Sequence, residues 1–241
     1  MKHSKLWRAT MTVLPMLVVS GLTMAVMAAV PADYKGKPWK DKAQEIPGKV
    51  WGAYYDVGGN GVAYNNKDTK NHGSGELNHG PEEKNNFRKE EGISISYTKA
   101  AFDKWLDTGK ILDIDEYYVG WTSTGESINY TVDVKEAGTY VVNMKASANN
   151  DNTEVSLAVN STQTTGPIKV EKTGYYHNWK MYNGIAELKL DKGLNVVTFK
   201  FEKEGNMNFM WLEFVPKGKD APAATPTKEA PKTTPTADKK G

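Results

Sequence analysis

The chain has 241 residues, a formal net charge of +2, 10% aromatic residues and no cysteine. The absence of cysteine excludes disulfides, thiol catalysis and zinc bound by thiolates, so a stable fold requires a hydrophobic core. The charged residues form no basic stripe of the kind that binds nucleic acid, and we expect no nucleic-acid partner.

Residues 1–29 have the pattern of a secretory signal peptide. Three basic residues precede an apolar run over residues 11–27, and Ala28 and Ala29 are the expected cleavage positions. Cleavage would leave 28 basic and 29 acidic residues, because this segment carries three of the 31 basic residues and no acidic one. The pattern predicts a secreted, extracellular protein without a membrane contact after cleavage; the alternative is an uncleaved membrane anchor.

The rest of the chain divides into three parts. Residues 30–46 are a charged, proline-containing lead-in segment, and residues 47–216 have the composition of one folded module. Residues 217–241 are rich in proline, threonine, alanine and lysine, with no large apolar residue after Val215. Such a segment cannot bury enough apolar surface to fold, which predicts a disordered tail or linker.

Within the module, short runs of alternating apolar and polar residues are separated by turn sequences. This pattern predicts about eight to ten short strands and an all-β fold, a two-sheet antiparallel β-sandwich or jelly roll. We expect loop over residues 65–86 and one or two helical turns over 100–106. The candidate strands span residues 50–56, 93–98, 128–134, 140–146, 154–159, 168–170, 178–181, 186–190, 194–201 and 208–215, and residues 62–64 are a short apolar segment.

Two details of strand pairing can also be predicted. Residues 128–134 and 140–146 alternate clearly, and the turn of hairpin length between them, 135–138, ends in glycine, which predicts a β-hairpin. In 194–201 the inward phase changes between Val196 and Val197, which predicts a β-bulge there.

Titratable side chains give weaker indications of chemistry. Glu126 is the best single acid, but no partner acid is marked by position, so we favour a loop hydrogen-bonding role over catalysis. The acidic stretch 113–116 lacks the glycine and ligand spacing of a calcium loop, and a solvated loop is favoured. No spaced second ligand accompanies the scattered histidines, which favours loop histidines over metal ligands. These are His72, His79 and His177.

The aromatic residues are the stronger signal. Trp179 and Trp211 fall in alternating strands, which favours core positions. Trp121 and Tyr176 fall in polar, turn-rich segments, where a ligand-binding role is favoured. The face of such a ring packs well against the C–H face of a sugar.

Four segments of the module resemble a known family. They begin at Ile46, Phe87, Tyr117 and Gly205 and read IPGKVWGAYYDVGGNGVAYNN, FRKEEGISISYTK, YYVGWTSTGESINYTVDVKEAGTYVV and GNMNFMWLEFV. In this order they resemble carbohydrate-binding modules of the family 6 type, in the variant found at the C-terminal ends of bacterial glycan-degrading proteins. The resemblance covers residues 47–216 and implies a two-sheet jelly roll.

The resemblance also implies a sugar site in the loops at one end of the sandwich. In this family two aromatic rings face each other above an asparagine, and an acid from a Gly-Glu motif lies nearby. Neighbouring asparagines would assist in orienting the sugar. The expected ligand-binding residues are Trp121, Tyr176, Asn208, Glu126, Asn65 and Asn66.

Modules of this family commonly carry a structural calcium ion, and here the sequence departs from the pattern. The matching ligand positions are Trp51, Ala53 and Met210. None of these side chains has the hard oxygen that calcium requires. We therefore expect no calcium at this place and no cofactor.

These observations predict a secreted, non-catalytic module that binds a plant or microbial polysaccharide of the β-glucan or xylan class. Its expected partners are that glycan and a linked or co-secreted glycan-degrading enzyme, and we expect a monomer. Two alternatives stay open because a fold does not determine a function. One is a glycan-active hydrolase or lyase on a β-sandwich, and the other is a cell-surface adhesion protein.

Overall fold

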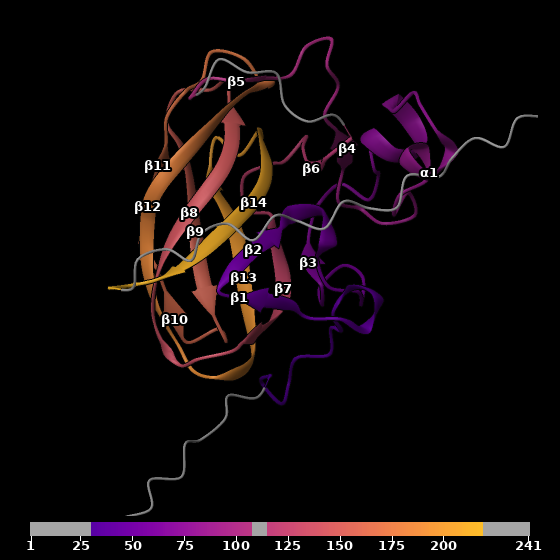
Figure 1. The fold of residues 1–241 in the computed structure, drawn as a ribbon. Helices are drawn as coiled ribbons and strands as arrows, with labels where there is room; N and C mark the ends of the chain where they lie inside the picture. The colour runs from indigo at the N-terminus through magenta and orange to yellow at the C-terminus, as the bar shows by residue number, and fades with distance from the viewer. Residues whose placement is uncertain (1–29, 108–114, 219–241) are drawn as a thin grey trace, which may run out of the picture.

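The computed structural model describes residues 30–107 and 115–218, so the expected signal peptide and nearly all of the expected tail lie outside the described residues. The described residues form two sheets that lie face to face as a β-sandwich (Figure 1). The prediction of an all-β, two-sheet fold is confirmed. None of the helices in the described part has the length and apolar composition needed to cross a membrane.

The first sheet is antiparallel except at one edge. There a strand from the expected lead-in segment, β1 (Gln44–Ile46), pairs in parallel with β7 (Ser127–Val134). The other members of this sheet are β13 (Gly193–Lys203), β9 (Thr153–Val159), β10 (Gln163–Thr164), β3 (Tyr64–Asn65) beside β7, and β11 (Ile168–Val170) beside β9.

The second sheet is built around β14 (Met207–Pro216), which lies between β8 (Gly138–Ala148) on one side and β6 (Tyr117–Val119) and β2 (Gly48–Trp51) on the other. Its remaining strands are β12 (Asn178–Leu190), β5 (Lys104–Trp105) and β4 (Ile95–Tyr97). Short helical turns complete the fold, and α1 lies to one side of the sandwich (Figure 1). They are η1 (Trp39–Asp41), η2 (Gly52–Tyr54), η3 (Gly73–Leu77) and α1 (Glu82–Asn85).

The core fills the space between the two sheets. The apolar residues that alternate along β7 and β8 are almost fully buried, as the sequence pattern predicted. Across the sandwich, Phe199 of β13 stacks on Phe209 of β14 with ring centroids 4.2 Å apart. Burying one such side chain stabilises the fold by about 1.5–3 kcal/mol, so this packing holds the two sheets together.

The predicted hairpin of β7 and β8 is wrong. Strand β7 pairs with β1, β3 and β13 in the first sheet, whereas β8 pairs with β12 and β14 in the second. The connection at residues 135–137 therefore crosses from one sheet to the other. The alternation of apolar and polar residues shows which residues of β7 and β8 face the core, and the two strands face it from opposite sides. The alternation does not show which strand lies beside each of them.

One further local prediction is wrong, and another is confirmed only in part. Val196 and Val197 pair in unbroken register with β7, so β13 has no bulge between them. Both are buried: Val197 belongs to the core between the sheets, whereas Val196 lies outside that core and lines a surface pocket with Tyr34 and Val62. Of the helical turns expected over 100–106, one forms at the start of the segment, where Phe102 N and Asp103 N both donate to Lys99 O. Residues 104–105 instead form β5, whose backbone pairs with the start of β12.

Candidate functional site

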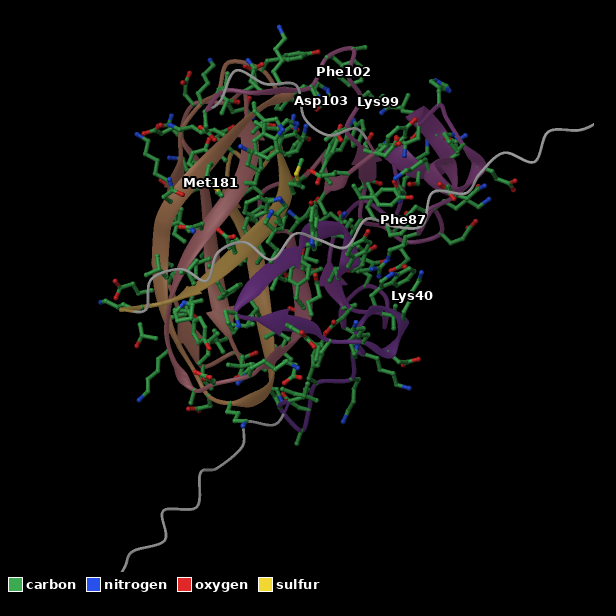
Figure 2. The ribbon with its side chains drawn as sticks, viewed as in Figure 1. Lys40, Phe87, Lys99, Phe102, Asp103 and Met181 are labelled. Atoms are coloured by element: carbon green, nitrogen blue, oxygen red, sulfur yellow. The ribbon has the colours of Figure 1, made fainter. Side chains whose placement is uncertain are left out.

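A pocket of about 350 Å³ opens at one end of the sandwich, where loops of both halves of the chain meet. Two of the residues that line it, Lys99 and Phe102, lie at the upper end of the molecule in Figure 2. Trp121 has the most exposed ring of the pocket, with 40% of its surface accessible. The ring side chains of the lining are Phe102, Tyr118, Trp121, Tyr176 and His177.

The backbone around Trp121 is fixed on both sides of the ring. Gly120 N donates to Ser94 O at 3.0 Å, and the Thr122 hydroxyl bonds the carbonyl of Gly205. Trp121 itself has φ of 51°, in the left-handed region that costs a residue with a Cβ about 1–2 kcal/mol. The turn that carries the exposed Trp121 ring is therefore held by hydrogen bonds on both sides and is strained at Trp121 itself. Strain of this type clusters at binding sites.

Asn208, near the start of β14, joins the two aromatic loops. Its Nδ2 donates to Tyr176 O at 2.6 Å, and the Ser147 hydroxyl donates to the same carbonyl. On the other side, a Cβ added at Gly120 would lie 2.7 Å from Asn208 Oδ1, so only glycine allows this approach. Within the described residues no donor bonds Oδ1, which leaves this oxygen as an acceptor in the pocket.

Three of the predicted ligand-binding residues, Trp121, Tyr176 and Asn208, are thus brought together in one pocket. Their role in binding stays a prediction. Glu126 does not line this pocket: its Oε2 accepts a hydrogen bond from Ser123 N at 2.9 Å, and burial raises the pKa of its carboxyl. The geometry gives Glu126 a part in shaping the turn before β7.

The two asparagines predicted to assist are also outside the pocket. Asn66 is buried, and its side chain donates to Gly92 O at 2.9 Å and accepts from Asp68 N at 2.7 Å. Asn65 is exposed, and its Nδ2 lies 3.5 Å from Gly125 O. Asn66 thus holds the loop between β3 and β4, whereas Asn65 contacts the turn before β7.

The sequence did not mark Lys99, Phe102 and His177 as pocket residues. They meet because Asp103, which is buried, accepts hydrogen bonds from Lys99 N at 2.6 Å and from His177 Nδ1 at 3.0 Å. The same carboxylate accepts the indole N–H of Trp179 at 2.7 Å. No local pattern reveals this cluster, since Asp103 and His177 are 74 positions apart.

The three positions that match the family's calcium ligands carry apolar side chains, and these side chains pack against other residues of the fold. Trp51 packs edge-on against Trp211 with centroids 6.5 Å apart, and Ala53 and Met210 are buried. No side-chain oxygen is offered at these places, so they do not fit calcium. Of the acidic stretch 113–116, residues 113 and 114 lie outside the described residues.

Comparison with known proteins gives one family. The family model described as carbohydrate binding module (family 6) matches residues 85–216. Among solved structures, a β-1,3-glucan binding CBM6 from Bacillus halodurans is 14% identical, with 72% of this chain and 98% of that chain covered and a TM-score of 0.45. CsCBM6-3 from Clostridium stercorarium, in complex with cellobiose, is 16% identical, with 72% and 96% covered and a TM-score of 0.44. A comparison with curated proteins gives no match.

Proposed function

Because the chain belongs to the family 6 carbohydrate-binding modules, we propose that its pocket holds one sugar unit of a polysaccharide between Trp121 and Tyr176. The observation that carries this proposal is the meeting of an exposed tryptophan, a half-buried tyrosine and an asparagine in one pocket. Aromatic faces pack against the C–H face of a sugar ring, and the Asn208 oxygen accepts a hydrogen bond from a hydroxyl.

The ligand on this proposal is a plant or microbial polysaccharide of the β-glucan or xylan class. The module is secreted and non-catalytic, and it keeps a linked or co-secreted glycan-degrading enzyme near its substrate by raising the effective concentration. The placement of Glu126 supports the binding role, since its carboxylate is bonded to Ser123 and not directed to the pocket lining. Two rings and a small polar floor bury little area, so the Kd is on the order of micromolar to millimolar.

Calorimetry with a panel of soluble β-glucans and xylans tests the site. Trp121→Ala should abolish binding without unfolding the module, because the ring is exposed and not part of the core. Leu194→Ala is the matched control: Leu194 is an equally exposed apolar residue, at 42%, on β13 and outside the pocket lining. Wild-type affinity in Trp121→Ala would refute the proposed site.

A second assay tests the non-catalytic role. The protein is incubated with the same panel, and reducing ends and unsaturated sugar ends are measured over time. We expect neither to increase above the level of a heat-denatured sample. Sustained release of either product would assign the protein to the glycan-active enzymes.

A further inference from the structure

The Lys99 side chain places a positive charge on the wall of the pocket, near the carboxylates of Asp103 and Asp115 but not paired with either of them. Its Nζ lies 3.2 Å from Tyr97 O and 3.4 Å from Ser96 Oγ, and within the described residues it forms no ion pair. The ammonium also lies 3.8 Å from the centroid of the Tyr97 ring. Burial lowers the pKa of Lys99, and the attraction of Asp103 and Asp115 offsets this effect only in part.

The nearest carboxylate of the cluster is already engaged. Asp103 accepts the backbone N–H of Lys99, the Nδ1–H of His177 and the indole N–H of Trp179, and it is almost completely buried. Figure 2 shows Lys99 and Asp103 close together at the upper end of the sandwich. Asp103 therefore orients the cluster, while the ammonium of Lys99 keeps hydrogen-bonding capacity for a ligand.

His177 is the second basic residue of the pocket lining, and it also has a polar atom available to a ligand. With Nδ1 bonded to Asp103, His177 has its Nε2 without a hydrogen-bond partner among the described residues. The titratable side chains of the described lining are Lys99, His177, Tyr118 and Tyr176, and none of them is a carboxylic acid. The lining itself therefore offers the positive charge of Lys99, while the carboxylate of Asp103 lies behind it and is engaged in hydrogen bonds.

From this arrangement we infer that the pocket selects a sugar unit that carries a carboxylate, a hexuronic acid, and that Lys99 binds that carboxylate. The inference rests on the proposed function, since it concerns a sugar held between Trp121 and Tyr176. A carboxylate on the sugar would form the ion pair that the half-buried ammonium of Lys99 does not form within the described residues. It would also accept a charge-assisted hydrogen bond from this ammonium. A neutral sugar hydroxyl gives a weaker bond to the same group.

The test uses oligosaccharides of a β-glucan and of a xylan, each in a neutral form and in a form that carries one glucuronic acid unit. For at least one pair, wild-type protein should bind the acidic member roughly tenfold more tightly, because a bond to a charged group is about twice as strong as a neutral one. The preference should decrease as salt is added, since the pair is partly exposed to solvent. Equal affinities for both members of both pairs would overturn the inference.

Two variants assign the preference to one side chain. Lys99→Met removes the charge and keeps an unbranched apolar stem, and the ratio of the two affinities should fall to about one. Lys99→Arg keeps the charge and should retain the preference. A full preference in Lys99→Met, with circular dichroism showing a folded protein, would also overturn the inference.

Failure of this inference can be told apart from failure of the proposed function. If acidic and neutral oligosaccharides bind equally and both are lost in Trp121→Ala, the glycan site stands and the selection by Lys99 is refuted. If neither form binds to wild type, or if binding survives Trp121→Ala, the proposed function itself is refuted together with the inference.

Discussion

The close contact between Gly120 and Asn208 makes Gly120→Ala a sharp probe of how the pocket is held together. The new Cβ would lie 2.7 Å from Asn208 Oδ1 and 3.3 Å from the Tyr118 ring. The first distance is shorter than a carbon and an oxygen tolerate, so Asn208 must move. Gly120 does not have the positive φ that would disfavour alanine by itself, so the contact alone is tested.

The magnitude follows from what Asn208 loses. If its side chain turns away, the hydrogen bond to Tyr176 O is broken, at a net cost of about 0.5–1.5 kcal/mol. If it stays, the overlap costs about 1–3 kcal/mol. We expect the free energy of unfolding to fall by about 1–2 kcal/mol. Glycan affinity should fall about tenfold or more, because the Tyr176 carbonyl loses one of its two side-chain hydrogen bonds and the pocket loses its polar floor.

Urea unfolding and calorimetry with the best glycan of the panel measure both effects. Gly138→Ala is the matched control, because Gly138 has no positive φ and a Cβ there would meet nothing within 4 Å. This control should keep wild-type affinity. Wild-type stability and affinity in Gly120→Ala would refute the view that Asn208 positions the Tyr176 loop.

Three further predictions concern strain, a buried charge and pH. Trp121→Gly should be more stable than Trp121→Ala by about 1 kcal/mol in urea unfolding, because only glycine adopts φ of 51° without cost; equal stabilities would contradict the strain. Arg88→Met should lower the free energy of unfolding by about 3–5 kcal/mol, because the buried guanidinium pairs with Glu91 and donates to three backbone carbonyls; a loss below about 1 kcal/mol would show that the network contributes little. The hydrogen bond to Asp68 raises the pKa of His72 above 6.5, so the stability that His72 contributes is complete below pH 6.5 and is lost as pH rises through the higher folded-state value. Thermal unfolding across that range should show this decline in the wild type and not in His72→Gln.

The β-sandwich was predictable because the period of two is strong in this sequence. Tyr140 and Val142 of β8 are buried as their alternation indicated, and so are Tyr130 and Val132 of β7. The pairing of these strands was not predictable, because a four-residue turn joins strands of one sheet or of two equally well. Only the start of the segment at 100–106 forms the predicted turn, since the conformation of residues 104–106 depends on backbone bonds to His177 and Trp179, far away in the sequence.

For the candidate site, sequence reasoning located the rings better than the polar groups. The role of Trp121 as a candidate binding residue could be predicted because it follows a glycine in a polar, turn-rich segment. A large aromatic residue in such a segment is not expected to belong to the core. Glu126 and Asn66 have equally suitable side chains, but these bond the backbone of their own loops, and nothing in the sequence distinguishes the two uses. Lys99 joins the pocket only through the fold of the Asp103 cluster, which no local pattern indicates.

The pairing of β2 with β14 has a consequence for the order in which the module forms. Trp51 lies opposite Trp211, 160 positions later, and β2 pairs with no other strand in the part of the chain that the structure describes. Its partner β14 is therefore absent until almost the whole module has been synthesised. Contacts between such distant segments slow folding, because a long loop must close before they contribute any stability. Asn208 belongs to the same late strand. The polar floor of the pocket is therefore completed in the step that closes the second sheet, and a partly synthesised chain has no finished pocket to offer a ligand.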